Sequence, residues 1–294
     1  GGSTVGDSVT VNDLVVTANA NAVTLNGAAN TFVAQVDFAN TAGTVTFGNA
    51  STDQSTFNGG LTVSGNQAVA LQGTITTSDD TVNFGTGAMT LGAASTVTTG
   101  SGAVTFGGAV NGGQTLAVNS TGATVFSAAV GGSTALTSLT TNAGGSVSLQ
   151  NVTTTGVQTY GENATLDGTY TTTNSQFTVT GTTTLGGATT VTTGSGGVTF
   201  TGAVDGGQTL AVDTTGATLF SAAAGGGTAL TSLTTNAGGA VSLQNVTTTG
   251  AQAYGENATL DGTYTTTNSA FTVTGTTTLG SATTVTTGSG GVTF

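Results

Sequence analysis

The chain repeats itself with a period of 94 residues over its C-terminal two thirds. Residues 97–190 and 191–284 agree at 81 of 94 positions, and residues 285–294 begin a third copy. Self-similarity of this length is typical of stacked repeat architectures, in which each unit packs only against its neighbours. We therefore divide the sequence into a diverged stretch of the same style (1–96), two full repeats and the start of a third. Because the third copy breaks off after ten residues, we expect the array to continue beyond it.

The composition predicts an all-β protein. Pro, which removes a ladder hydrogen bond, is absent, and the β-branched residues Thr and Val are abundant. Apolar and polar residues alternate with a period of two at 115–118 and 177–180, as in half-buried strands. The 50 glycines alone would suit a disordered linker, but such linkers lack regularly recurring apolar residues.

Large apolar residues recur at short intervals inside each repeat. They are spaced by 20, 23, 17, 19 and 15 residues at Phe106, Phe126, Leu149, Leu166, Leu185 and Phe200. This spacing predicts five coils per repeat, with corners at Gly-Gly and Asn/Asp-Gly pairs, which tolerate tight turns. The fold class we expect is a rod-shaped parallel β-helix (β-solenoid) of about 15 coils of 15–23 residues.

The charge and the missing residue types exclude several classes of function. The formal net charge is −12 with no Lys or Arg, which argues against binding nucleic acid or anionic membranes. No apolar run approaches the ~20 residues of a membrane-spanning helix. Without His or Cys, nucleophilic triads and thiolate–zinc sites are excluded. We expect no cofactor, no metal and no enzymatic activity.

Two tyrosine–glutamate pairs are the best candidates for a ligand surface. Tyr160 and Glu162 recur as Tyr254 and Glu256 in the second repeat. The rings could stack on sugars, and Glu162 with Asp167 could form the carboxylate pair of a glycosidase or supply hard ligands for calcium. The alternative is that the tyrosines pack or cover turns and that the acids are solvated turn residues.

Asp79 and Asp80 form the densest acidic spot and are a weak candidate calcium site, with an ordinary loop as the alternative. Rows of Thr, such as 171–173, are also found on ice-binding solenoids. The uneven coil lengths argue against that function, because a lattice-matched face needs regular coils.

Two segments resemble a known protein family. They are Ala-Leu-Thr-Ser-Leu-Thr-Thr-Asn-Ala-Gly-Gly at 135–145, repeated unchanged at 229–239, and Thr-Thr-Thr-Gly-Val-Gln-Thr-Tyr-Gly at 153–161, repeated at 247–255 with two changes. They are similar to repeats of the filamentous-haemagglutinin-like secreted bacterial exoproteins and related adhesins. The resemblance implies a right-handed parallel β-helix, export from a Gram-negative-type cell and a role as a stalk, adhesin or matrix fibre.

These observations predict a structural extracellular rod or filament segment of a bacterium: a fibre, stalk or adhesin shaft. We expect its partners to be further copies of itself, end to end along the fibre axis, with surface glycans as a second class of partner. Two alternatives stay open. One is a carbohydrate-binding or carbohydrate-cleaving β-helix, and the other is a subunit of a self-stacking sheath or amyloid-like polymer.

Overall fold

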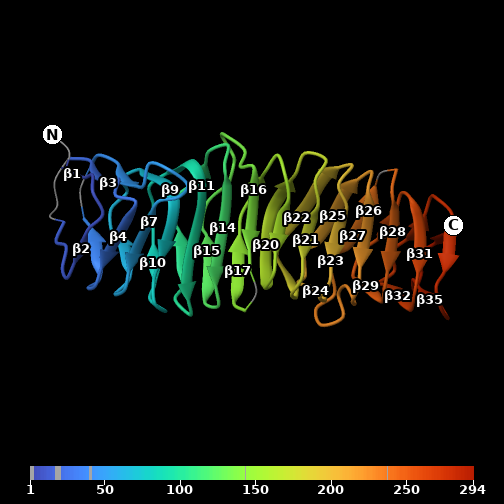
Figure 1. Ribbon diagram of the computed structural model, residues 1–294. Helices are drawn as coiled ribbons and strands as arrows, with labels where there is room; N and C mark the ends of the chain where they lie inside the picture. The colour runs from blue at the N-terminus through green and yellow to red at the C-terminus, as the bar shows by residue number, and fades with distance from the viewer. Residues whose placement is uncertain (1–2, 17–20, 40–41, 143, 237) are drawn as a thin grey trace. The chain divides into compact units, whose positions relative to one another are not determined.

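The chain is a parallel β-solenoid of about 13 turns. The computed structural model describes residues 3–16, 21–39, 42–142, 144–236 and 238–294, and these residues contain strands and turns but no helix. Within residues 1–154, Figure 1 shows strands of neighbouring turns side by side, such as β9 (Val69–Thr76) and β11 (Met89–Gly100), which pair in parallel. The expected all-β class and β-helix architecture are confirmed.

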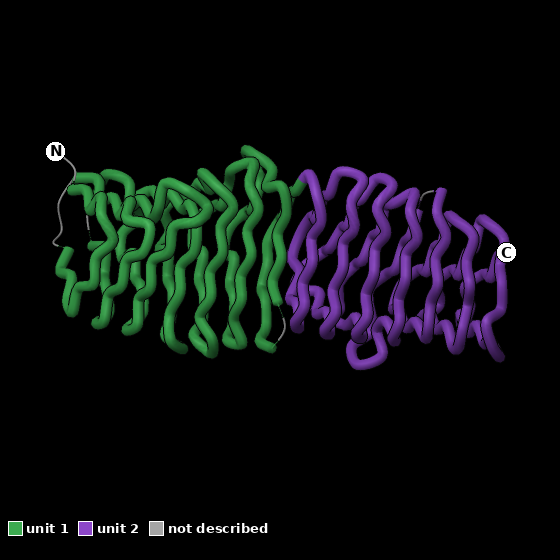
Figure 2. Tube along the Cα trace, viewed as in Figure 1, with its two compact units in different colours: residues 1–154 green, residues 155–294 purple. Residues whose placement is uncertain are grey.

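The chain divides into two compact units, Gly1–Thr154 and Thr155–Phe294 (Figure 2). The boundary falls inside the first full repeat, 97–190, so the units do not follow the repeats. Each unit is built from short strands.

The strands of the first unit are β1 (Ser3–Val5), β2 (Thr10–Val11), β3 (Val23–Leu25), β4 (Ala29–Phe32), β5 (Val36–Phe38), β6 (Val45–Phe47), β7 (Gln54–Phe57), β8 (Leu61–Val63), β9 (Val69–Thr76), β10 (Val82–Asn83), β11 (Met89–Gly100), β12 (Val104–Phe106), β13 (Val110–Asn111), β14 (Thr115–Ser120), β15 (Ala123–Phe126), β16 (Ser138–Thr141), β17 (Ser146–Leu149) and β18 (Val152–Thr153). Those of the second unit are β19 (Gln158–Tyr160), β20 (Asn163–Thr171), β21 (Phe177–Val179), β22 (Thr183–Gly194), β23 (Val198–Phe200), β24 (Val204–Asp205), β25 (Thr209–Thr214), β26 (Ala217–Phe220), β27 (Ser232–Asn236), β28 (Ala240–Leu243), β29 (Val246–Thr248), β30 (Gln252–Tyr254), β31 (Asn257–Leu260), β32 (Thr263–Thr266), β33 (Phe271–Val273), β34 (Thr277–Leu279), β35 (Thr284–Thr286) and β36 (Val292–Thr293).

Alternation along each strand sorts the side chains between the interior and the surface. In β9 buried and half-buried residues alternate over all eight positions, because successive side chains point to opposite faces of a strand. Neighbouring turns then pair in parallel, as β23 does with β26. The sequence distance between paired residues ranges from 17, for Ala240 with Asn257, to 25, for Ala29 with Gln54.

Aromatic and aliphatic columns fill the interior. In the first unit Phe106 stacks on Phe84 and on Phe126, with ring centroids 5.0 and 4.5 Å apart. In the second unit Phe200 and Phe220 stack at 5.1 Å. Stacked rings in buried columns add about 0.5–1.5 kcal/mol per pair to the burial of their area.

The predicted count of five coils per repeat is wrong. Phe200 does not stack on Leu185: the residues of β22 next to Leu185, Thr183 and Thr184, pair with Val204 and Asp205, 21 residues later. The 15 residues from Leu185 to Phe200 therefore cover two of the three sides of a turn, from the start of β22 to β23. As a result, each full repeat has one third of a turn fewer than predicted, which accounts for part of the difference between the about 15 turns expected and the about 13 turns observed.

One repeat thus spans four turns and two thirds of a fifth. From Phe200 the column of paired residues runs over four turns to Leu279, the counterpart of Leu185. The column of paired residues that contains Phe177 ends at Thr277, whereas its counterpart Phe271 lies in a different sheet. Equivalent residues of successive repeats therefore face different sides of the solenoid.

Candidate functional site

The tyrosines proposed as a ligand surface lie in the interior. Tyr160 is 0 % exposed and Tyr254 is 1 % exposed, so neither ring can stack on a sugar in this structure. In the second unit, both rings contact a phenylalanine edge to face: Tyr160 meets Phe177, and Tyr254 meets Phe271, each at 5.7 Å. The alternative interpretation, that these rings pack the core, is the one the structure supports.

A buried glutamine satisfies each of these hydroxyl groups. The Tyr254 hydroxyl donates to Gln252 Oε1 at 3.1 Å, and Gln252 Nε2 donates to the Thr265 carbonyl at 2.9 Å. The first repeat has the same bond from Tyr160 to Gln158, at 3.2 Å. Buried polar groups need such partners, because an unpaired one loses its hydration without compensation.

The second tyrosine of each repeat supports a corner. The Tyr264 hydroxyl donates to the Leu243 carbonyl at 2.9 Å and accepts a bond from the Asp261 backbone N–H at 3.0 Å. Burial raises the pKa of Tyr264 to about 12 and that of Tyr254 well above 10. The rings therefore stay neutral near pH 7 and serve as hydrogen-bonded packing residues.

The two glutamates are buried, which contradicts the alternative interpretation that they are solvated turn residues. Glu162 is 5 % exposed and Glu256 is 7 % exposed. Glu256 Oε2 has no hydrogen-bond partner among the described residues. Burial raises the pKa of the Glu256 carboxyl above its ordinary value of 4.5, and the Thr235 side chain and the backbone N–H groups of Glu256 and Gly255 offset only part of this rise.

Glu256 is expected to make the stability of the chain depend on pH. The folded chain takes up the Glu256 proton at a higher pH than the unfolded chain, so the free energy of unfolding rises as the pH falls toward 4.5. Glu256→Gln removes this contribution, and the variant should exceed the parent in stability at pH 7 by a margin that shrinks on acidification. Urea unfolding over a pH series measures the margin.

The matched control is Asp213→Asn. Asp213 is exposed, and the equivalent position of the first full repeat carries an asparagine, Asn119. A margin for Glu256→Gln that stays constant between pH 4.5 and 7 would show that burial does not raise the pKa of its carboxyl.

Asp79 has a structural role at a corner. Its backbone has φ +84, and its Oδ1 accepts a hydrogen bond from the Ser101 N–H of the next turn at 2.9 Å. Asn174 and Asn268 do the same, with φ +51 and +52 and bonds to Ser195 and Ser289 at 3.0 and 3.1 Å. Since an uncharged asparagine fills this place twice, the carboxylate charge is not what the corner needs.

Asp80 belongs to the same turn through its main chain. Its carbonyl accepts a hydrogen bond from the Thr77 hydroxyl at 2.6 Å. Within the described ranges, no three or more His, Cys, Asp or Glu side chains lie close enough together to hold a metal ion. No third acidic side chain among the described residues therefore joins Asp79 and Asp80 to support the calcium prediction.

A second type of corner has the same side-chain-to-backbone hydrogen bonds in both repeats. Asn111 Oδ1 accepts from the N–H groups of Ser133 and Thr134 at 2.9 and 3.1 Å. Its counterpart Asp205 accepts from Gly227 and Thr228 at 2.7 and 2.9 Å. Side chains of this type cap loop N–H groups and need no ligand to explain them.

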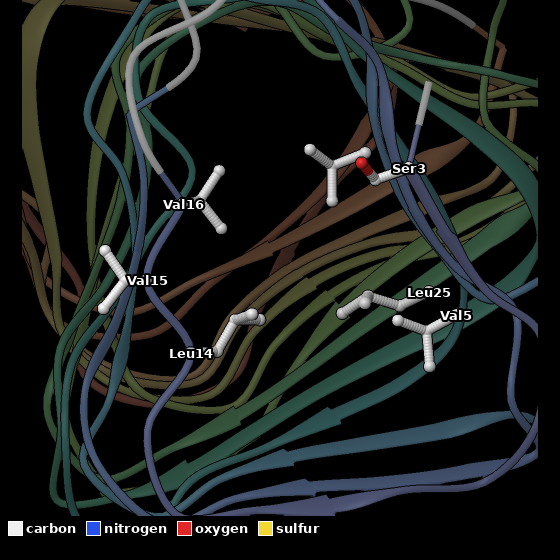
Figure 3. A pocket seen from close by; sticks show the side chains of 7 residues that line it. Ser3, Val5, Leu14, Val15, Val16 and Leu25 are labelled. Atoms are coloured by element: carbon white, nitrogen blue, oxygen red, sulfur yellow. The ribbon is translucent and has the colours of Figure 1, made fainter. Parts of the chain in front are cut away.

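The described residues of the first unit line hollows at two places. One, of about 230 Å³, opens at the first turn between β1 and residues 14–16, and its lining is apolar apart from Ser3. Figure 3 shows Leu14 and Leu25 pointing toward each other across it. The other, of about 340 Å³, is a shallow groove lined by uncharged residues such as Asn83, Thr105 and Ser127.

The fold and these corner bonds define a parallel β-solenoid repeat protein. No protein-family model matches the chain, and no curated protein or solved structure matches it either. The described residues contain no helix that is long and apolar enough to cross a membrane.

Proposed function

We propose that this chain is a structural, non-enzymatic segment of an extracellular bacterial filament: a fibre, stalk or adhesin shaft. The observation that carries the proposal is that the chemically distinctive side chains serve the fold. The tyrosines and glutamines pair inside the solenoid, and Asp79, Asp205 and their counterparts cap corners. These groups stabilise turns and columns, which is the work of a scaffold.

The exposed surface supports the same proposal. Among the described residues the exposed large hydrophobic side chains are Val15, Val33, Val157, Leu219, Leu279, Val292 and Phe294. Phe294 is the one aromatic side chain among them, and it lies in the last turn. Glycan-binding surfaces usually rely on exposed aromatic rings, so a scaffold fits better than a lectin or a glycosidase.

The family resemblance and the charge complete the proposal. Similarity to filamentous-haemagglutinin-like exoproteins rests on the repeated motifs at 135–145 and 153–161, and it favours secretion and display on a bacterial surface. A net charge of −12 without any basic residue keeps like segments soluble by mutual repulsion. Further copies of the chain, joined end to end, are the partners we propose.

Adding one repeat tests the scaffold function. Insertion of a second copy of 191–284 should lengthen the particle by ~22 Å, because four and two thirds turns each add ~4.8 Å. Electron microscopy of single particles measures the length. A glycan array run in parallel should stay blank. An unchanged length, or a glycan bound by parent and variant alike, would overturn the scaffold in favour of a binding domain.

A further inference from the structure

Three corners of the solenoid combine the same two sequence motifs on neighbouring turns. The first motif is Thr, any residue, Asn or Asp, and then Ser or Asp, and the second motif is Thr-Gly-Ser-Gly on the next turn. The pairs are 77–80 with 99–102 in the first unit, and 172–175 with 193–196 and 266–269 with 287–290 in the second unit. The joint recurrence of the two motifs indicates that they act on each other.

The two motifs fit each other at the side chain of the Asn or Asp. Its Oδ1 accepts the hydrogen bond from the serine N–H of the next turn, as in Asn174 with Ser195. Gly194, just before that serine, has φ +60, and a Cβ there would collide with Asn174 Oδ1. The glycines at 100 and 288 are in the same situation, with φ +56 and +60. The second motif therefore needs glycine because the acceptor of the preceding turn fills the space of a side chain.

Threonine hydroxyl groups hold each motif in one shape. The Thr193 hydroxyl donates to the Gly196 carbonyl at 2.5 Å, and the Thr266 hydroxyl donates to the Ser269 carbonyl at 2.5 Å. The Gly196 carbonyl also accepts a bond from the Thr214 hydroxyl of the following turn at 2.5 Å. A network of this kind fixes the corner more firmly than one bond would.

The corner contact is in register with the strands that lead into it. Thr171 of β20 pairs with Thr192 of β22, and three residues later on both turns Asn174 contacts Ser195. The same offset separates the other paired threonines from their corner contacts, 76 and 98 from 79 and 101, and 265 and 286 from 268 and 289. The contact therefore forms when the strands pair as they do here.

The strands by themselves specify this register weakly. On the outward face of β20 and β22, threonine lies beside threonine at two successive pairs, 169 with 190 and 171 with 192. On the inward face Tyr170 pairs with Val191, whose inward neighbours are the buried Thr189 and Thr193, which are similar to valine in size. A slip by two residues keeps every side chain on its own face, so the apolar pattern does little to prevent it.

We infer that the two motifs form a register lock, in which the Asn or Asp corner of one turn selects the Thr-Gly-Ser-Gly corner of the next turn and opposes a slip of the strands by two residues. Such a slip carries the Ser195 N–H about 6.6 Å along the strand direction and breaks its bond to Asn174. The register lock concerns how the turns align and does not rest on the proposed function.

Engineered cysteine pairs report the register. Thr171→Cys with Thr192→Cys joins paired residues and should form a disulfide under mild oxidation. Thr171→Cys with Thr190→Cys and Thr169→Cys with Thr192→Cys each join positions two residues out of register, ~8 Å apart, which a disulfide cannot span. These two pairs should oxidise in slipped chains alone. Mass spectrometry after thiol labelling measures the oxidised fraction, and circular dichroism checks that the variants are folded.

Variants of the corner test the register lock in these backgrounds. Asn174→Gly removes the acceptor and tolerates the φ of +51, and the oxidised fraction of the out-of-register pairs should rise roughly 5- to 10-fold, as the loss of one hydrogen bond allows. Gly194→Ala pushes a Cβ against the acceptor and should raise the fraction as well. Asn174→Asp should match the parent, because Asp79 makes the same bond.

Gln176→Ala is the matched control. Gln176 is exposed beside the same corner, and its counterpart in the second repeat is Ala270, so this variant should also match the parent.

Three results would overturn the register lock. The first is a lower urea midpoint for Asn174→Gly with out-of-register disulfides at the parent level, which would make the corner a stabilising contact and nothing more. The second is a rise for Asn174→Asp equal to that for Asn174→Gly. The third is a parent chain in which the out-of-register pairs oxidise as readily as the paired threonine positions.

Discussion

Replacing Tyr254 by Ala is expected to destabilise the chain by about 3–5 kcal/mol, with no effect on any sugar-binding surface. The ring is 1 % exposed and packs against Phe271 at 5.7 Å. Truncation of a buried aromatic side chain removes its burial and leaves a cavity, which costs about this much. Urea or thermal unfolding followed by circular dichroism measures the loss.

Tyr254→Phe separates the ring from its hydroxyl. This variant keeps the packing but leaves Gln252 Oε1 without its donor, so we expect a smaller loss of about 1–3 kcal/mol. If Tyr254→Ala unfolded like the parent but bound glycans less well, the ring would have to be exposed, and the buried assignment would fail.

Gly206→Ala is expected to cost about 3 kcal/mol or more. Gly206 has φ +113, a conformation open in practice to glycine alone, and strain of this kind costs about 1–3 kcal/mol. A Cβ there would also lie 2.5 Å from the Leu185 carbonyl oxygen of the preceding turn. Backbone cannot move aside without breaking the pairing between β22 and β24.

The neighbouring glycine provides the control. A Cβ built on Gly207 meets nothing within 4 Å, so Gly207→Ala should leave the free energy of unfolding within about 0.5 kcal/mol of the parent. Urea unfolding midpoints of Gly206→Ala and Gly207→Ala, measured side by side, compare the two losses of stability. Equal losses at both positions would show that the corner does not have this geometry.

The repeat and the period-two alternation were enough to predict the fold class. A long internal period, no proline and regular apolar positions leave few architectures other than a solenoid. The number of turns could not be predicted, because apolar landmarks do not say on which side of a turn they lie. Leu185 and Phe200 look like neighbours in one column, but β22 carries the chain around two sides between them.

It was also not possible to tell from the sequence that the tyrosines of the candidate ligand surface face the interior. An aromatic residue with a hydroxyl, next to a glutamate near a turn, is typical of both a binding surface and a satisfied core residue. The signal for the core was present: Gln252 and Tyr254 are two residues apart, so they share one face of a strand. A glutamine on the inward face can satisfy the buried hydroxyl, and this is what the structure shows.

The corner role of Asp79 was not visible in the sequence. Asp79 and Asn174 lie in different repeat contexts, and only the turn geometry shows that both accept a bond from a serine of the next turn. Asp79 and Asn174 occupy equivalent corners, and Asp can replace Asn there because both side chains offer an acceptor oxygen.

Each turn of the solenoid stacks on the one before it, and engineered cysteine pairs test this stacking most directly because the chain has no cysteine of its own. Thr190 and Ala211 are paired in adjacent turns, where Cα atoms about 4.8 Å apart permit a disulfide. We predict that Thr190→Cys with Ala211→Cys forms an intramolecular disulfide under mild oxidation, whereas Thr184→Cys with Thr199→Cys stays reduced. Oxidation of the second pair and not the first would place Phe200 on Leu185 and contradict the solenoid described here.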